Sequence, residues 1–408
     1  MPPPKVFHLH DMAASSHELL TSLLKEVSRS FYLTLRVLPG SIRPQIGLAY
    51  LLARATDTIA DTEIIPLADR LNALQAMEDN ISGKSSAPLQ LDEFVRLEAG
   101  TDEDGTRRRE ENPTAKGAAS RPTNSAGAFP LSPTGGEGRG EGAVTSGGTV
   151  RRRSAPTAVE RDLLERIEES LLLLNQFSSA DQHLIRQVLQ TIVSGQALDL
   201  ERFAGARPDR IVLLQTEEEL DDYTYRVAGS VGEFWTRICR SHVFPAAPID
   251  ESTLLVNAVR FGKGLQLVNI LRDFPADLRN GRCYLPAEAW QRFGLSPATV
   301  LEATQAPAFR RLYQSYLTQA EGHLAAGWIY TNALPRRCVR VRLACSWPIL
   351  IGVRTVERLR ASNVLDAAHP IKVPRAEVRK IMARSLLYYP WPKAWNRLFE
   401  RAQRAGQT

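Results

Sequence analysis

The chain has few cysteines, and they show no spacing that indicates a shared site. Cys239, Cys283, Cys338 and Cys345 are the four cysteines in 408 residues, with no CxxC pair and no metal-ligand spacing to a histidine. The seven histidines are scattered in the same way, so we expect no zinc site. We interpret the cysteines as reduced thiols of a cytoplasmic protein.

Long apolar runs are also missing. The most apolar late stretch, residues 343–353, covers about 11 residues, whereas a helix needs roughly 20 to span a bilayer. The N-terminal residues show neither the charged nor the apolar region of a secretory signal. We therefore expect no membrane anchor, and the sequence leaves open a peripheral contact with the inner face of a membrane.

The alternation of apolar and polar residues that marks a half-buried strand is absent over any useful length. Apolar residues recur instead at steps of three and four, which is typical of amphipathic helices. We predict an all-α protein, a single-domain helical bundle around a central cleft. The expected helices begin near residue 16 and after Pro44, cover residues 65–82, 159–177, 180–204, 217–240, 253–279, 309–332, 337–362 and 373–386, and end with a short one near the C-terminus.

Core-forming residues almost disappear between residues 99 and 158. This segment is rich in Gly, Pro, Ser and Thr and cannot bury enough apolar surface to offset the entropy cost of ordering. We predict a disordered insertion, with residues 1–98 and 159–408 forming one domain. The glycines of residues 99–158 do not form GxGxxG and follow no strand, so they do not indicate a nucleotide-binding site.

The formal charge of +6 and the pI near 9.2 suggest an anionic partner. Arginine runs within residues 99–158 contribute to this charge, so it is weak support for nucleic acid, and we expect no nucleic-acid partner. The competing interpretation, in which these runs bind nucleic acid, predicts salt-sensitive binding that disappears when residues 99–158 are deleted.

A polar stripe runs along the expected helix in residues 261–286. Gln266, Asn269, Asp273 and Asp277 follow one another at steps of three or four, which places their side chains on one helical face. Their sequence neighbours are those of a buried helix. Two carboxylates and two amides within an apolar run must find partners, and metal ions would satisfy them.

A second helix of the same design lies far upstream. Tyr50, Arg54, Asp57 and Asp61 also occur at steps of three or four among apolar residues. Two such helices facing each other would form an acidic cleft suited to Mg²⁺, which prefers oxygen ligands and is often shared with substrate phosphates. One DxxxD pair alone is more often a solvated helix face than a metal site.

Arginines close to these aspartates supply forked donors for phosphate oxygens. Arg54, Arg272 and Arg282 are near the pairs in sequence, and Arg29 is a further candidate. If the cleft holds a diphosphate that leaves, the remaining allylic carbocation needs an apolar pocket with aromatic faces. The candidate walls are Phe31, Tyr32, Tyr50, Tyr223, Tyr225 and Phe234, with Tyr225 ranked first.

The motifs together resemble the squalene/phytoene synthase family of all-α head-to-head prenyl transferases. DTIAD at 57–61 and NILRDFPAD at 269–277, followed by GRCYLP, are similar to the two aspartate-rich motifs of that family. SRSFY at 28–32 and YTYRVAGSVG at 223–232 resemble two further family segments, in the family order. The resemblance covers the chain except residues 99–158 and the extreme termini.

The resemblance implies roles for individual residues. It implies that Asp57, Asp61, Asp273 and Asp277 bind Mg²⁺ and two prenyl diphosphates. The substrate-binding residues that we assign on this basis are Ser28, Arg29, Ser30, Phe31, Tyr50, Arg54, Gln266, Asn269, Arg272 and Arg282. The catalytic candidates are Tyr225, Tyr223, Arg54 and Arg272.

In such enzymes two identical prenyl diphosphates condense to a cyclopropylcarbinyl diphosphate, and the end product depends on whether NADPH supplies hydride. DTIAD is closer to the DTVED of squalene synthases than to the DELVD of phytoene synthases, which favours farnesyl diphosphate and squalene. Phytoene or dehydrosqualene, made without NADPH, is the alternative. We expect a monomer.

Two positions depart from the family pattern. Pro275 lies between Asp273 and Asp277, where it removes a helical hydrogen bond to the Leu271 carbonyl and makes a kink more probable. Arg226 stands where some squalene synthases have tyrosine, which leaves the choice between Tyr223 and Tyr225 open. A hypothesis of another class is a non-catalytic helical partner subunit, which would have no need of charged residues in an apolar cleft.

Overall fold

The computed structural model describes most of the chain outside the segment that we predict to be an insertion. Two predicted substrate-binding residues, Arg29 and Ser30, lie outside the described residues, as does most of residues 99–158. The described residues are 18–28, 31–97, 155–298, 300, 306–365 and 371–404.

The described residues are almost entirely helical, which confirms the all-α prediction. The helices are α2 (Leu24–Ser28), α3 (Phe31–Val37), α4 (Arg43–Asp61), α5 (Leu67–Ser82), α6 (Asp92–Arg96), α7 (Ala158–Glu165), α8 (Ile167–Leu174), α9 (Ser179–Arg202), α10 (Glu217–Thr224), α11 (Ser230–His242), α12 (Glu251–Arg279), α13 (Ala287–Arg292), α14 (Ala306–Ala333), α15 (Val339–Ala361), α16 (Arg375–Tyr388) and α17 (Pro392–Arg404). The remaining elements are the π-helical turns η1 (Leu19–Leu23) and η2 (Tyr225–Gly229) and the strands β1 (Val212–Leu213) and β2 (Arg282–Cys283).

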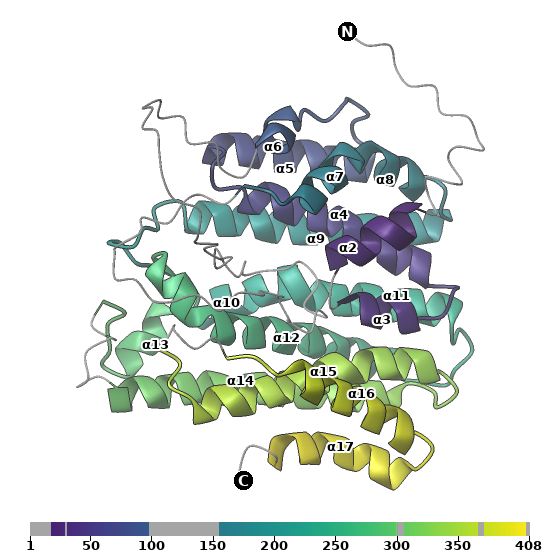
Figure 1. The fold of residues 1–408 in the computed structure, drawn as a ribbon, viewed down its shortest axis with the longest axis vertical. Coiled ribbons are helices and arrows are strands. Elements are labelled where there is room, and N and C mark those ends of the chain that lie inside the picture. Colours follow the sequence, from purple (N-terminus) through teal and green to yellow (C-terminus); the bar gives the residue numbers. More distant parts are fainter. Residues whose placement is uncertain are drawn as a thin grey trace, which may run out of the picture.

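The helices form stacked layers (Figure 1). In one part α4 packs against α5, α8 and α9, because Leu48, Leu51 and Leu52 on α4 are fully buried. In the other part α12 is central and packs against α11, α14 and α15. The long helix α9 contacts both α4 and α11, so it joins the layer of the first aspartate motif to that of the second.

Several local expectations were wrong. Residues 159–177 form two helices, α7 and α8, which are separated at Arg166. The Thr157 hydroxyl caps α7, and Ala158 is the first residue of this helix. The short helices α3, α6 and α13 and the parallel pair of β1 with β2 were not expected as separate elements, because a few residues carry no periodic signal.

The small residues of the YTYRVAGSVG segment allow a close helix crossing. A Cβ atom added to Gly232 would lie 2.1 Å from the Ala258 carbonyl oxygen, and one added to Gly262 would lie 2.1 Å from the Ala228 carbonyl oxygen. Only glycine fits at both positions, so the backbones of α11 and α12 touch. At Gly232 the element that approaches this segment is helix α12.

No helix in the described part of the chain combines the length and the apolar character needed to cross a bilayer. The four cysteines are all buried and form no disulfide.

Candidate active site

The first aspartate motif lies near the C-terminal end of α4. Asp57 is 3% exposed and accepts hydrogen bonds from Arg54 Nη1 and from Gln196 Nε2 on α9, each at 3.1 Å. Arg54 also forms an ion pair with Glu160 on α7. Burial by itself lowers the pKa of Arg54, but Asp57 and Glu160 raise it by more, so the net shift is upward and the guanidinium stays charged. The Glu160 carboxylate additionally accepts from the Thr157 amide at 2.8 Å.

The second motif lies on α12, where the polar stripe faces inward. Arg272 Nε donates to Asp273 Oδ1 at 2.8 Å, and Arg272 Nη1 donates to Asn269 Oδ1 at 3.1 Å. Gln266 is 1% exposed, and its Oε1 accepts no hydrogen bond from any residue in the described part of the chain. Asp277 is also buried, at 5% exposed.

Pro275 does not interrupt α12, which continues to Arg279. Proline removes the amide that would donate to the Leu271 carbonyl. The Tyr313 hydroxyl on α14 donates to that carbonyl oxygen at 2.7 Å instead. A hydrogen bond from α14 therefore replaces the missing hydrogen bond within α12. The replaced bond lies close to Asp273, two residues after Leu271.

The turn after α12 brings Arg282 back towards the first motif. Gly281 has φ +77°, and an added Cβ would lie 2.0 Å from the Arg207 carbonyl oxygen, so this position requires glycine. Arg282 then pairs with Val212 in the parallel ladder of β1 and β2. Its Nη2 donates to Glu63 Oε1 at 3.1 Å. Burial lowers the pKa of Arg282, but nearby acidic groups including Asp61 raise it overall.

Two tyrosines and Asp199 lie between the two motifs. The rings of Tyr223 and Tyr284 stack with centroids 4.9 Å apart, and Tyr284 Oη donates to Asp199 Oδ2 at 3.0 Å. Burial, followed by the charges of Asp199, Asp277 and Asp57, raises the pKa of Tyr223 well above its usual value. Tyr223 is therefore within electrostatic range of aspartates from both motifs, which belong to one site.

Asp199 on α9 is a buried carboxyl whose pKa is raised. Burial raises its pKa to about 6, although Arg282 and the hydrogen bond from Tyr284 partly oppose the shift. Its second oxygen, Oδ1, has no hydrogen-bond partner among the described residues.

The structure brings most of the predicted site residues together but not Tyr225. The hydroxyl of Tyr225 lies 3.5 Å from Glu233 Oε1, and Lys263 Nζ lies 5.7 Å from its ring centroid. The neighbouring groups that act on its pKa are Glu233 and Arg237, and none of the motif aspartates is among them. Tyr223, which we ranked below Tyr225 as a substrate contact, is the tyrosine beside the aspartates.

The SRSFY segment flanks α4. The Ser28 hydroxyl donates its hydrogen bond to the Leu24 carbonyl, within the same helix. Phe31 stacks on Tyr50 with ring centroids 4.9 Å apart, and Tyr50 precedes Arg54 by one helical turn. These two rings therefore form an aromatic wall beside the first motif.

The charges and oxygen atoms of the site fit divalent cations. Burial and the neighbouring Asp57 carboxylate raise the pKa of Asp61 well above its usual value, although Arg54 and Arg282 partly oppose the shift. The buried oxygens Gln266 Oε1 and Asp199 Oδ1 have no hydrogen-bond partner among the described residues. No three acidic, histidine or cysteine side chains in the described residues converge closely enough to hold an ion. An ion here must therefore take further ligands from water or from an anionic substrate.

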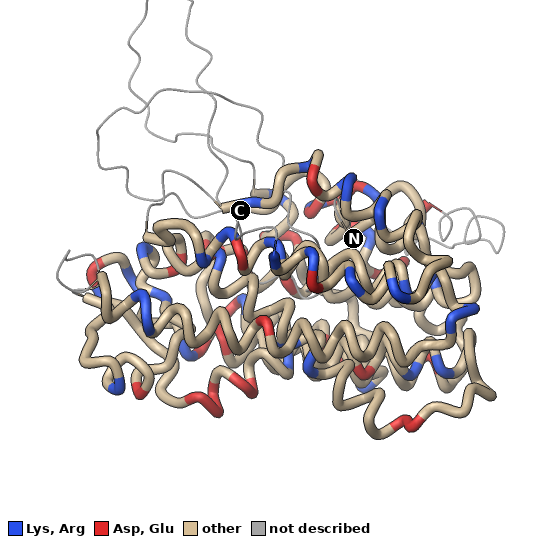
Figure 2. The backbone as a smooth tube through the Cα atoms, turned by 90° about the horizontal axis from the view of Figure 1, so that it is seen from below, with Lys and Arg blue, Asp and Glu red and all other residues tan. Residues whose placement is uncertain are grey.

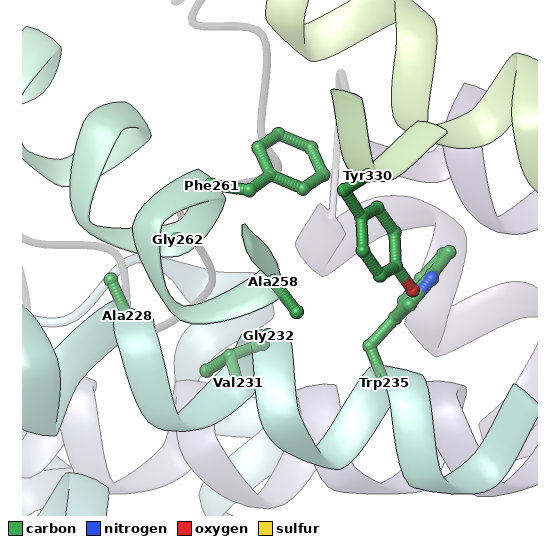
Figure 3. A pocket seen from close by; sticks show the side chains of 8 residues that line it. All are labelled: Ala228, Val231, Gly232, Trp235, Ala258, Phe261, Gly262 and Tyr330. Atoms are coloured by element: carbon green, nitrogen blue, oxygen red, sulfur yellow. The ribbon is translucent and has the colours of Figure 1, made fainter. Parts of the chain in front are cut away.

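An apolar cavity lies one turn beyond the polar stripe (Figure 3). Gly262, which lines it, precedes Gln266 by four residues and shares its helical face. Phe261, Tyr330 and Trp235 supply aromatic walls, and the rest of the lining is small and apolar. The cavity lies between α11, α12 and α14, on the same face of α12 as Gln266.

The sequence profile of one known family, described as squalene/phytoene synthase, matches residues 24–120 and 147–377. The matched segments cover well over half of the chain and include both aspartate motifs. The chain belongs to the squalene/phytoene synthase family. The gap in the match, residues 121–146, falls within the low-complexity segment.

Curated relatives in this family share about a third of the aligned residues. Presqualene diphosphate synthase of Zymomonas mobilis is 35% identical over 145 residues, which are 35% of this chain and 44% of the relative. The 15-cis-phytoene synthase of Synechocystis sp. is 33% identical over 221 residues, 52% of this chain and 58% of the relative. The alignments thus span less than two thirds of these relatives.

Solved structures show the same fold at lower identity. A complex of TcSQS with a ligand has a TM-score of 0.63 at 19% identity, and the match covers 96% of this chain and 98% of that chain. At this identity the similarity establishes the fold alone.

Sequence reasoning missed the residues that connect the family motifs. Gln196 and Asp199 received no role from the sequence, although they repeat the pattern of polar residues at helical spacing. Tyr284 belongs to GRCYLP and also received no role. Glu160 had no visible signal, because its link to Arg54 joins residues 106 positions apart.

Proposed function

We propose that the protein is a Mg²⁺-dependent prenyl transferase that condenses two farnesyl diphosphates head to head, through presqualene diphosphate, to squalene. The observation that carries the proposal is that aspartates of both α4 and α12 act on Tyr223, while Arg282, which follows α12, is influenced by Asp61 of α4. The names of the relatives, presqualene diphosphate synthase and phytoene synthase, support the same class of reaction.

At the charged end, the chain binds and orients diphosphate. Arg54, Arg272 and Arg282 present forked donors, and each is held by a carboxylate in the described structure. Magnesium ions bound by Asp57, Asp61, Asp273 and Asp277 would supply positive charge to the leaving diphosphate. The arginines would add to that stabilisation from fixed positions, which costs little reorganisation during the reaction.

Tyr223 is suited to donate a hydrogen bond rather than to accept a proton. Burial and the surrounding carboxylates raise its pKa, so its Oη keeps its proton at neutral pH. A neutral phenol can donate to an oxygen of the departing diphosphate. The stack with Tyr284 holds the ring in place, because Tyr284 is fixed in turn by Asp199.

The prenyl chains would extend from the charged end along the apolar side of α12, where water would be excluded. The cavity lined by Phe261, Trp235 and Tyr330 continues the line of the polar stripe on α12. Aromatic faces there and at Phe31 and Tyr50 would stabilise the allylic cation that remains when diphosphate leaves, by up to roughly 2 kcal/mol for each desolvated contact.

The choice of product rests on the sequence rather than on the site geometry. DTIAD favours the C15 substrate, and squalene as product requires NADPH as hydride donor. Dehydrosqualene from the same substrate, or phytoene from the C20 substrate, needs no NADPH and is the alternative. A non-catalytic partner subunit is the hypothesis of another class.

Product analysis tests these alternatives directly. The full chain would be incubated with Mg²⁺ and either farnesyl or geranylgeranyl diphosphate, each with and without NADPH, and the products identified by mass spectrometry. We expect squalene from farnesyl diphosphate with NADPH. Phytoene from the C20 substrate would overturn the substrate assignment, and no diphosphate release under any condition would favour the non-catalytic hypothesis.

Single substitutions in the two motifs test the shared site. Asp57→Asn and Asp273→Asn should each lower turnover by at least about a thousandfold, since each removes a carboxylate from the charged end. Asp69→Asn, at an exposed position on α5, is the matched control and should keep full activity. Circular dichroism should show an unchanged helical fold in all three. Substantial activity in either motif variant would contradict the two-motif site.

A further inference from the structure

The last two helices hold the excess positive charge of the chain. Residues 375–404, which span α16 and α17, contain eight Lys or Arg and two Glu, a formal net charge of +6. The whole chain has the same formal charge of +6 at pH 7. Residues 99–158 hold nine Lys or Arg against seven Asp or Glu, so the arginine runs are not its main source.

These positive charges point outward, whereas one of the two acidic side chains points inward. Glu377 accepts from Arg354 and Arg358 of α15, so its charge is used within the fold. Glu400 forms a 3.4 Å ion pair with Arg404 on α17. The exposed basic residues are Arg375, Arg379, Lys380, Arg384, Lys393, Arg397, Arg401 and Arg404.

Exposed apolar side chains gather where α16 ends and α17 begins. Leu386, Leu387 and Trp391 are 55%, 58% and 57% exposed, and they lie within six residues of one another in sequence. We call these three residues the apolar tip. Single exposed apolar residues are common on protein surfaces, but two leucines and a tryptophan together indicate an interaction surface.

The tip and the basic residues share one side of the molecule. Lys393, Arg397 and Arg401 follow at steps of four, which aligns them along α17. Arg401 Cζ lies 5.3 Å from the ring centroid of Tyr388, the residue after Leu387, so this basic stripe runs beside the end of α16. α17 is the outermost helix in Figure 1, and Figure 2 views the molecule from its side.

The apolar side of α17 is already used in packing. Trp395, Leu398 and Phe399 are buried, and Trp395 stacks on Trp328 with ring centroids 5.3 Å apart. The helix therefore has a fixed orientation, and its basic stripe must face away from the core. A rigid helix that presents positive charge beside exposed Leu and Trp suits a partner with anionic groups at its surface and an apolar layer directly below them.

We propose that the apolar tip and the basic stripe dock the protein onto an anionic lipid bilayer. Leucine and tryptophan enter the boundary between headgroups and acyl chains, while Lys and Arg attract the anionic headgroups. Neither contribution alone anchors a protein firmly, but the two act together. The docking concerns this surface only and does not depend on which product the proposed active site makes.

Vesicle sedimentation tests the docking. The full chain would be spun with vesicles of phosphatidylcholine alone, or with phosphatidylglycerol added, at low and high salt. We expect binding only to the anionic vesicles and weaker binding at high salt. Acyl chains brominated near the headgroup should quench tryptophan fluorescence, and Trp391→Phe should remove that quenching while leaving vesicle affinity nearly unchanged.

Matched variants separate this surface from general stickiness. Leu386→Ser/Leu387→Ser/Trp391→Ser and Lys393→Gln/Arg397→Gln should each lower affinity for anionic vesicles by about tenfold or more. The apolar control is Val256→Ser/Ile329→Ser, at residues 61% and 57% exposed elsewhere, and the charge control is Arg310→Gln/Arg311→Gln. Both controls should bind like the unaltered chain, and all variants should keep activity on detergent-dispersed substrate.

Three outcomes would overturn the proposal. The first is no binding of the unaltered chain to anionic vesicles, and the second is equal loss of binding in the control variants. The third is that the protein sediments as a dimer, and that the triple tip variant is a monomer that still binds vesicles. That result would mean that the tip contacts a second copy of this chain rather than a bilayer.

Discussion

Asp199 is a buried carboxyl whose ionisation opposes folding. Its pKa is raised to about 6 in the folded protein, from 3.8 for an unperturbed aspartate. Between these values the folded chain binds a proton that the unfolded chain has lost. The free energy of unfolding therefore falls as pH rises from about 4 to about 6, by at most about 3 kcal/mol, and the loss is complete above pH 6.

The substitution Asp199→Asn should remove this dependence, because the amide has the same shape and no charge. Relative to the unaltered chain, the variant should gain up to about 3 kcal/mol at pH 7 and little near pH 4. Urea unfolding at several pH values, in the presence of a chelator, measures the difference. Asp209→Asn, at an exposed loop position, is the control and should follow the unaltered chain at every pH.

Tyr313 is predicted to position the second aspartate motif through the Leu271 carbonyl. Tyr313→Phe leaves that buried oxygen without its donor, which should cost about 1–3 kcal/mol of stability. Because the carbonyl lies within the helix that carries Asp273 and Asp277, the Mg²⁺ concentration for half-maximal activity should also rise several-fold. Activity measured against Mg²⁺ concentration gives this shift.

The neighbouring Tyr316 provides the control for this prediction. Its hydroxyl donates to Glu217 at 2.8 Å, so Tyr316→Phe also removes a hydrogen bond made from α14. It should lose comparable stability without a change in the Mg²⁺ requirement. An equal shift in both variants would mean that Tyr313 has only a general structural role.

Among the helices, the crossing of α11 and α12 depends on two glycines. Gly232→Ala would place a Cβ 2.1 Å from the Ala258 carbonyl oxygen, so one of the two helix backbones must shift. We expect a loss of about 2–3 kcal/mol in thermal or urea unfolding. Gly322→Ala on α14 meets nothing within 4 Å and should instead stabilise by about 0.5–1 kcal/mol, so equal effects would contradict this packing argument.

At the scale of the whole molecule, the low-complexity segment leaves and re-enters the fold at one place. Arg161 Nη1 donates to the Leu97 carbonyl at 2.9 Å and to the Pro156 carbonyl at 3.1 Å, so these two residues lie close together. Replacing residues 99–154 by a short Gly-Ser linker should therefore keep fold and activity. The shorter loop should also add about 1–2 kcal/mol of stability.

The boundary of that deletion matters, because Thr157 and Glu160 belong to the fold. A longer deletion that removes both would take away the cap of α7 and the carboxylate that holds Arg54. It should lower both thermal stability and turnover. If the shorter deletion prevented folding, residues 99–154 would be a structural element rather than an insertion.

The sequence by itself determined the helices and the two motifs, because local spacing carries that information. A step of three or four residues fixes which side chains share a helical face, as for Asp57 with Asp61 and for Asp273 with Asp277. Long apolar repeats likewise located α9, α12, α14 and α15 to within a few residues. The family followed from the order of these motifs, and the family profile confirms it.

Only the tertiary structure decided how these elements complete the site. It placed Tyr223 rather than Tyr225 beside the aspartates, supplied Tyr313 to the carbonyl freed by Pro275, and paired Arg54 with Glu160. Each of these contacts joins residues from different helices or turns, or depends on which way a helix faces its neighbours. No local pattern encodes such pairings, because they arise from the way the helices pack and from the burial of charge that packing imposes.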